Sequence, residues 1–382
     1  MVPRRKFMAL AGGSLILAAG GLALWATTRD PAQARAAWAV AGHGGRDPRR
    51  RALSFAILAP NPHNRQPWIA DLSVVDEITL YCDPERRLPE TDPFDRQITI
   101  GLGCFLELLS QAAAADGHRA EVTLFPDGEP QPRLDGRPVA RIRLVADANA
   151  VADPLFGQVL VRRSNKEAYD TARSVAAADL ERVAKAARTS AVSWTNDAGQ
   201  VAELRGIAWE AMFTELKNPP TFKESVDLMR IGKAEIEANP DGIDLSGAFI
   251  EALAFSGLLS REVILDTSST AFQQQLPILK EPFETAMAFL WLSTSGNSRA
   301  DQIAAGRDHV RLNLAATAAG LSMQPFSQAL QEFALMQPHY ERMRNALGIS
   351  PGDTLQMFVR LGYGPEIVAS PRWQAETRIR NG

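Results

Sequence analysis

Cysteine is scarce in this 382-residue chain, which contains only Cys82 and Cys104. The two have no metal-ligand spacing and are too few for a disulfide framework; an oxidising compartment would permit a bridge between them, but nothing in the sequence requires one. An excess of charge of one sign is also lacking, because the formal net charge is -3 and the basic residues are scattered. Nucleic acid is therefore not expected as a partner. No metal cluster and no Ser-His-Asp arrangement stands out, so we predict no metal site and assign no catalytic residue.

The composition is that of a soluble globular protein. Hydrophobic residues make up 46% of the sequence and charged residues 22%, which provides enough apolar area for a full core. The part that follows the N-terminal segment, about 350 residues, suits one large domain or two of ordinary size. No low-complexity tract occurs after residue 40.

The N-terminal segment predicts export. Arg4 and Arg5 precede an apolar run, Met8–Ala26, that carries no charge. This arrangement resembles a twin-arginine export signal, which implies the twin-arginine machinery as a partner and a periplasmic or other extracytoplasmic location. Ala32-Gln33-Ala34 offers a cleavage site. A membrane anchor is a compatible alternative, since nineteen apolar residues nearly span a bilayer. Residues 1–34 are therefore a signal or an anchor.

A proline-rich loop follows the apolar run 52–58. It reads Leu58-Ala-Pro-Asn-Pro-His-Asn-Arg-Gln-Pro-Trp68. Its three prolines lack backbone donors and hold their neighbours extended, so the segment cannot be the interior of a helix or a central strand. A stiff loop that presents amide side chains suits recognition of a planar heterocycle. A loop that merely caps a helix is the alternative.

Two helical segments are related to each other. Gly103–Gly117 aligns without gaps on Gly306–Gly320, and each reads as a helix with an apolar stripe, a small-residue second half and a terminal Gly. Small residues at matched positions would allow the two helices to approach closely, as an interface between similar halves requires. Chance similarity between two Ala-rich helices is the alternative.

The remaining pattern predicts mixed helices and strands. Period-two runs bounded by Asp, Pro or Gly indicate strands, whereas the Pro- and Gly-rich stretch 126–138 indicates a loop or hairpin. The segment 217–281 mixes helical pieces with Asn-Pro, Asp-Gly and Leu-Pro breaks. The expected strands are 77–82, 140–145 and 356–361, and the expected helices include 203–216 and 283–292.

A cluster of basic and hydroxyl side chains forms the second chemical signal. It reads Val161-Arg-Arg-Ser-Asn-Lys166. Two guanidiniums, a hydroxyl and an ammonium within five residues can surround a phosphate, to which the guanidinium offers bidentate geometry. A basic helix end, where these charges offset the helix dipole, is the alternative.

Both signals resemble motifs of the nitroreductase family. The loop is similar to the P-S-x-x-N-x-Q-P-W segment that lies against flavin mononucleotide (FMN), and the basic cluster is similar to the R-x-S-x-K/R motif that holds the FMN phosphate. The segments Asp92–Arg96, Arg360–Tyr363 and Ser370–Arg372 resemble the Acg-type subgroup, in which two nitroreductase-like halves are fused in one polypeptide.

This resemblance implies an α+β, nitroreductase-like fold in which two fused halves form a pseudo-dimer of sheets flanked by helices. We place the first half at 35–140 and the second at 141–382, with an insertion at about 217–281. The loop occurs once, in the first half, and the phosphate motif once, in the second, so one composite FMN site per chain is expected.

By the same resemblance, the FMN-binding residues come from the loop, the basic cluster, the segment after the second repeat helix, and the C-terminal segment. Three depart from the family pattern, because Asn61 replaces Ser, Ser327 replaces Glu and Gln328 replaces Gly. The candidates are Pro60, Asn61, Asn64, Gln66, Arg162, Ser164, Lys166, Ser327, Gln328 and Arg372.

Three further residues of the loop have predicted roles. Trp68 is expected to pack beneath the loop rather than stack on the flavin, and His63 to face solvent rather than donate a proton. Arg65 is either a cation near the flavin N1–O2 edge or a surface residue.

The predicted function is that of an FMN-dependent oxidoreductase that acts on a small-molecule redox substrate. Nicotinamide donors are scarce outside the cytoplasm, so an exported enzyme would need another donor or a membrane redox partner. One alternative is a protein that holds FMN without turnover, with 217–281 as a lid. Another keeps the fold and drops the cofactor.

Overall fold

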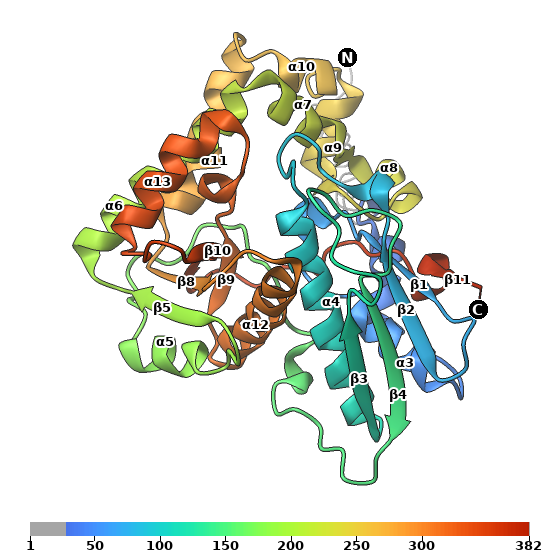
Figure 1. Cartoon of the computed structure of the whole chain (residues 1–382). Helices are drawn as coiled ribbons and strands as arrows, with labels where there is room; N and C mark the ends of the chain where they lie inside the picture. The colour runs from blue at the N-terminus through green and yellow to red at the C-terminus, as the bar shows by residue number, and fades with distance from the viewer. Residues whose placement is uncertain (1–27, 382) are drawn as a thin grey trace, which may run out of the picture.

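The computed structural model describes residues 28–381 of the chain, and the predicted export segment lies mostly outside them. Two separate antiparallel sheets are flanked by helices, and helices α7 to α11 form an arch above them (Figure 1). The predicted α+β class is confirmed.

The first sheet is built around residues 68–146. Its strand order is β11-β1-β2-β4-β3, with every pair antiparallel except β1 and β11. Along β2 and β4 buried side chains alternate with more exposed ones, as the period-two pattern predicts. The predicted strands 77–82 and 140–145 are confirmed. The strands are β1 (Trp68–Asp71), β2 (Glu77–Cys82), β3 (His118–Leu124), β4 (Ala140–Ala146) and β11 (Ile379–Arg380).

The second sheet, β5-β8-β10-β9, repeats the order of the strands β1-β2-β4-β3 of the first sheet and has no counterpart of β11. All its pairs are antiparallel. The predicted strand 356–361 is confirmed within β10. The predicted helix 283–292 is wrong, because it spans the end of α11 and the strand β8. The first five residues of β8 are all buried, and a strand covered on both faces has no alternation to distinguish it from a helix. The strands are β5 (Ala191–Thr195), β8 (Ala288–Thr294), β9 (Ser322–Pro325) and β10 (Thr354–Gly362).

The two related helices are α4 (Arg96–Ala115) and α12 (Arg299–Ala318), which pack against each other between the sheets (Figure 1). Each follows the second of its sheet's four matched strands and precedes the third. Of the described residues, α4 alone is long and apolar enough to cross a membrane, but 83% of its apolar window is buried inside the protein. It is a core helix.

Contact between the two helices is reciprocal. A Cβ atom added to Gly103 would lie 2.2 Å from the carbonyl oxygen of Ile303, and one added to Gly306 would lie 2.0 Å from that of Ile100. The same offset that aligns the two helices aligns these two pairs of residues. The predicted close approach is therefore confirmed, and it has the self-complementary form of contact between two copies of one unit.

The first residue of each helix also reaches across to the other side of the molecule. Arg96 donates to the carbonyls of Gln356 (2.8 Å) and Leu330 (2.7 Å). Arg299 donates to those of Pro130 (3.2 Å) and Pro132 (2.8 Å). Both guanidiniums are buried, so each side of the molecule is fastened to the other by a pair of matched arginines.

The other helices cover the sheets and fill the predicted insertion. The helix predicted at 203–216 is confirmed within α6, and 126–138 is irregular, as predicted. The helices are α2 (Ala36–Ala39), α3 (Pro48–Ala56), α5 (Ala177–Ala184), α6 (Ala198–Lys217), α7 (Pro219–Asp227), α8 (Gly232–Ala238), α9 (Ala248–Phe255), α10 (Arg261–Leu265), α11 (Thr270–Glu284) and α13 (Gln337–Ala346), with a small sheet of β6 (Met229–Ile231) and β7 (Ile243–Leu245).

The division predicted at residue 140 would cut the first sheet. Strand β4 pairs with both β2 and β3, so the first unit extends at least to Ala146. The C-terminal segment also returns to this unit. Strand β11 pairs with β1, and the amide of Arg372 donates to the carbonyl of Ala34 at 2.8 Å. The range 141–382 is therefore not one unit, because both of its ends belong to the first sheet's side of the molecule.

Candidate functional site

The predicted flavin loop has a strained backbone. His63, Asn64 and Gln66 all have positive φ, at 45°, 50° and 51°. Left-handed backbone is uncommon for residues other than glycine and costs on the order of 1 kcal/mol or more at each position, so the surrounding structure must hold it. Asn61 contributes, because its Oδ1 accepts from the amide of Gln66 at 2.7 Å and its Nδ2 donates to the carbonyl of Ala59 at 3.1 Å. The residue that departs from the family pattern thus braces the loop from inside.

Gln66 joins three segments that are distant in the sequence. Its side chain is fully buried, with Nε2 donating to the carbonyl of Pro240 at 2.7 Å and Oε1 accepting from the amide of Trp373 at 2.9 Å. Nearby, the amide of Gly242 donates to the carbonyl of Asn64 at 3.2 Å. The segment 217–281 and the C-terminal segment are therefore both fastened to the loop. Whether 217–281 moves as a lid stays a prediction.

Two buried guanidiniums meet at the start of this loop. Arg162 donates to the carbonyl of Leu58 at 3.0 Å and to Oδ1 of Asn313 on α12 at 3.1 Å. Arg372 donates to Oδ1 of Asn64 at 2.6 Å and to the same Leu58 carbonyl at 3.4 Å. The side chains of the two arginines are 2% and 5% exposed. The structure thus brings Asn64, Arg162 and Arg372 into one cluster, which we call the arginine cluster.

The arginine cluster carries uncompensated positive charge. Within residues 28–381, neither Arg162 nor Arg372 has a carboxylate within ion-pair distance, and Nε of Arg162 is buried without a hydrogen-bond partner. Burial, together with smaller contributions from neighbouring arginines, lowers the pKa of Arg162 to about 10 and that of Arg372 to about 9. The acid that acts on Arg372 is Asp244, and burial raises its own pKa. Buried cations with so little opposing charge are stabilised by an anion.

Trp38 of α2 lies over this cluster and belongs to neither of the two sequence motifs. Its ring centroid is 5.9 Å from the guanidinium carbon of Arg162, 5.6 Å from that of Arg372 and 4.9 Å from that of Arg163. The face of an indole attracts cations and excludes water from one side of them. A tryptophan within the Ala-rich stretch that follows the proposed cleavage site was the available signal.

The rest of the basic motif is arranged around Asn165, which stands at a variable position of the R-x-S-x-K/R pattern. Asn165 is buried; its amide donates to the carbonyl of Met323 at 3.0 Å and its Nδ2 to Oγ of Ser322 at 3.1 Å. These bonds tie the motif to β9 of the second sheet. Ser164 is half-buried beside it, and Lys166 is exposed.

His63 is half-buried rather than solvent-facing as predicted. Its Nδ1 is buried without a hydrogen-bond partner, and its pKa is lowered to about 4, first by burial and then by the charges of Lys166 and Arg65. Lys166 is therefore close enough to the loop to act on it electrostatically.

Trp68 packs beneath the loop, as predicted, with its ring centroid 5.1 Å from that of Phe105. Arg65 is not a surface residue. Its side chain is buried and donates to the carbonyls of Glu85 and Arg86 within the first unit. Pro60 is buried at the base of the loop.

Ser327 and Gln328 lie at the far end of β9, away from the hydrogen bonds of the arginine cluster. The buried carboxyl of Glu215, whose pKa burial raises to about 7, accepts from Nε2 of Gln331 at 2.8 Å and lies near Gln328. The structure does not bring these two residues together with Asn64 or Arg162 by any contact of the described residues. Their place at the site stays a prediction.

Other reactive side chains are sparse in the part of the chain that the structure describes. Cys82 and Cys104 are both free and buried, and burial raises the pKa of each thiol. Within residues 28–381, no group of three His, Cys, Asp or Glu side chains is placed to hold a metal. Two cavities, of about 550 and 290 Å³, are lined by residues other than those of the arginine cluster.

His309 lies one helical turn before Asn313 on α12 and provides a test of the cluster. Its ring is buried with Nδ1 unpartnered, and burial, with a smaller contribution from Arg162, lowers its pKa to about 3. Between pH 3 and the ordinary pKa of 6.5, His309 is protonated in the unfolded chain and neutral in the folded chain. Stability contributed by a neutral His309 is therefore complete above pH 6.5 and is lost as the pH falls, by about 1.4 kcal/mol per pH unit.

We expect the change His309→Gln to reduce the slope of the unfolding free energy against pH between pH 6 and pH 4.5. The reduction should correspond to about one proton, or about 1.4 kcal/mol per pH unit. Asp92 and Glu215, whose pKa values burial raises to about 7, act in the opposite direction, but they remain in both proteins and cancel in the comparison. Urea unfolding at several pH values measures the two slopes. Equal slopes would show that His309 is not held neutral beside Arg162.

No protein-family model matches the chain. Two curated proteins of Mycobacterium tuberculosis are similar to it over most of its length. "Putative NAD(P)H nitroreductase Rv3131" is 25% identical over 321 residues, which cover 83% of this chain and 85% of that protein. "Putative NAD(P)H nitroreductase acg" is 26% identical over 333 residues, which cover 84% and 91%.

Among solved structures, an FMN-dependent nitroreductase from Mycobacterium smegmatis in complex with NADPH is 18% identical and covers 53% of this chain and 84% of its own, with a TM-score of 0.33. A structural similarity with this TM-score is too low to support an inference about the chain. The sequence relatives carry the comparison: the chain is similar to these two proteins over more than four fifths of its length.

Proposed function

We propose that the chain is an FMN-dependent oxidoreductase of the nitroreductase type. The observation that carries the proposal is the arginine cluster. Arg162 and Arg372 are buried at the start of the strained loop, and in the part of the chain that the structure describes no carboxylate is paired with them. A phosphate dianion matches two guanidiniums in charge and in hydrogen-bonding geometry. The unpartnered Nε of Arg162 provides a further donor.

The chain's own residues divide the work of binding. Arg162 and Arg372 would hold the phosphate, with Trp38 shielding them from water and Lys166 adding positive charge from the surface. Asn64 and Gln66 would position the loop against the ring. Bound FMN would supply electron or hydride transfer to a small-molecule substrate, which this chain's residues must orient.

We further infer the Acg-type arrangement of two fused halves. The identical strand order of the two sheets, the reciprocal Gly103 and Gly306 contact and the crossed arginines Arg96 and Arg299 support it. The loop comes from the first half, and the basic motif joins the second half through Asn165. One FMN site per chain, assembled from both, follows from this division.

A flavin-holding protein without turnover is the second candidate. The segment 217–281 closes on the loop through Pro240 and Gly242, and such contacts suit retention of a ligand. The relatives are named as NAD(P)H nitroreductases, which favours a nicotinamide donor and hence the enzyme. Export would separate the protein from cytoplasmic nicotinamide, so a different donor follows if export is correct.

The absorbance of purified protein separates these candidates. We expect flavin bands and, after heat release, a ratio near one FMN per chain. Reduction of the bands by NADPH, NADH or another soluble donor supports the enzyme, whereas flavin inert to every donor supports storage. Absence of flavin even after incubation with FMN would overturn both, and a ratio near two would overturn the single composite site.

Export by the twin-arginine route is proposed from Arg4 and Arg5, which lie outside the described residues. This route carries folded proteins, so the cofactor can be inserted before export. Changing both residues to Lys keeps the charge but should leave the protein in the cytoplasm. Cell fractionation with a control protein exported by the general secretory route measures the change, and unaltered distribution of the double variant would contradict the proposal.

A further inference from the structure

We propose that helix α9 and the turn after it dock on the lipid bilayer that the N-terminal apolar run enters, so that the protein lies against the membrane through this face. The proposal rests on the N-terminal segment acting as an anchor and is independent of the flavin. It assigns an interaction surface, residues 249–258, and a partner, the interfacial region of a bilayer.

The exposed side of α9 is apolar. Phe249 is 73% exposed, Phe255 95% and Leu258 65%, and Ala252 between them is exposed as well. Phe249, Ala252 and Phe255 are spaced by three and lie along the outer side of α9, and Leu258 follows in the turn after the helix. No residue of α9 is fully buried. A helix on a water-covered surface turns polar side chains outward, whereas the outer side of α9 is apolar.

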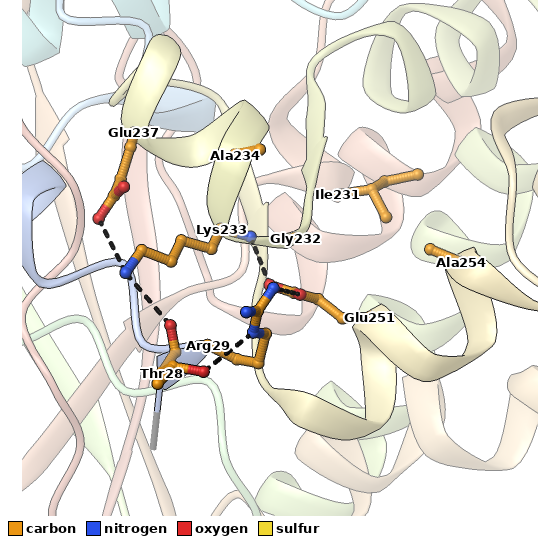
Figure 2. Close-up of a pocket in the computed structure, with 9 residues that line it drawn as sticks. All are labelled: Thr28, Arg29, Ile231, Gly232, Lys233, Ala234, Glu237, Glu251 and Ala254. Carbon is orange, nitrogen blue, oxygen red and sulfur yellow. Dashed lines mark hydrogen bonds and ion pairs between the residues drawn. The ribbon is translucent and has the colours of Figure 1, made fainter. Parts of the chain in front are cut away.

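The charge of α9 points the other way, into the protein. Glu251 accepts from the amide of Lys233 at 2.8 Å and pairs with Arg29 at 3.2 Å. The Lys233 ammonium in turn donates to the carbonyl of Thr28 at 3.2 Å. Figure 2 shows these side chains meeting between α8 and α9, where they line the cavity of about 550 Å³. The outer stripe is left without a charged group.

These same contacts fix where the chain emerges. Thr28 and Arg29 are held against α8 and α9, and the apolar run ends two residues earlier, at Ala26. Two residues span about 7 Å at most. A bilayer that contains the run Met8–Ala26 therefore begins within reach of the apolar stripe.

The structure also favours retention of the anchor over cleavage. Ala34, the last residue of the proposed cleavage motif, is 3% exposed, and its carbonyl accepts from the amide of Arg372 at 2.8 Å. It lies in a short helix, Ala32–Arg35. A peptidase binds an extended, accessible segment, so the folded protein shields this motif.

The apolar stripe could also be covered by the N-terminal run itself or by a second copy of the chain, but a bilayer suits it better than either. The nineteen-residue run is about 29 Å long as a helix, which matches a hydrocarbon core, and it would have to leave the bilayer to cover α9 itself. A second copy would bring two stripes together but would not place them beside the anchor. The stripe contains no cation, so its insertion is apolar and should not depend on anionic lipid.

The test uses the full chain in phosphatidylcholine vesicles. Phe255→Cys is labelled with an environment-sensitive fluorophore, which the buried Cys82 and Cys104 do not take up in the folded protein. Val75→Cys, 80% exposed in the turn between β1 and β2, is the matched control. At position 255 we expect blue-shifted emission, quenching by lipid-borne nitroxide and protection from aqueous iodide. At position 75 we expect the reverse.

The outcomes are distinct. A label at position 255 that iodide quenches and nitroxide lipid does not would show that the stripe faces water. A label shielded from both quenchers would show that protein covers it, either a second copy or the N-terminal run, and would equally overturn the proposal. Replacing part of the lipid with phosphatidylglycerol should leave the nitroxide quenching unchanged; quenching that requires the anionic lipid would contradict the apolar mode of docking.

Discussion

Purified Arg162→Ala protein is expected to lose its FMN. The change removes a charge-assisted contact with the phosphate, worth roughly 2–4 kcal/mol, or about 30- to 1000-fold in affinity. Arg162 also bonds to Leu58 and Asn313, so thermal unfolding must first show that the variant is folded. Titration of FMN against each protein, followed by flavin absorbance, measures the change in dissociation constant.

Arg163→Ala is the matched control, since this neighbour is half-exposed and bonds to nearby backbone carbonyls of its own segment. It should keep FMN. Asn64→Ala should lose a neutral hydrogen bond, roughly 0.5–1.5 kcal/mol, and retain most of the flavin while its spectrum shifts. Riboflavin, which has no phosphate, should bind wild type and Arg162→Ala with similar weak affinity. A large difference in riboflavin binding would place Arg162 at the ring or in the fold and refute the phosphate assignment.

Gly306→Ala is expected to destabilise the whole protein strongly. Its new Cβ would lie 2.0 Å from the carbonyl oxygen of Ile100 and 2.9 Å from Cα of Gly103, and both of these are backbone atoms that no side-chain rotation can move. Helices α4 and α12 would have to separate along a buried interface. We expect a loss of about 3 kcal/mol or more in the free energy of unfolding, measured by urea denaturation.

Two companion variants make this result specific. Gly103→Ala meets the Ile303 carbonyl at 2.2 Å and should be equally destabilising if the contact is reciprocal. Gly206→Ala, in the interior of α6 with nothing within 4 Å of its new methyl group, should gain up to about 1 kcal/mol from helix propensity. A loss below about 1 kcal/mol at Gly306, or a loss at only one of the two interface glycines, would contradict the packing of two equivalent helices.

The local elements of the fold follow from the sequence where periodicity is strong. Strand β2 begins and ends where its alternation does, and the alignment of Gly103–Gly117 on Gly306–Gly320 predicts the close contact of α4 with α12. Strand β8 was mistaken for a helix, because burial on both faces removes the alternation that marks a strand. The pairing of β11 with β1 was not foreseen either, because two residues carry no pattern and their partner is some 300 residues away.

For the candidate site too, some properties follow from the sequence and others depend on the tertiary structure. The sequence by itself determined which side chains have the right chemistry, since a guanidinium at Arg162 and an amide at Asn64 have their donors and charge wherever they lie. Only the tertiary structure decided that Arg372 joins them and that Trp38 covers them. Their meeting depends on a C-terminal segment that folds back on the first sheet, and such long-range contacts are fixed by the packing of the whole chain rather than by any local stretch of it.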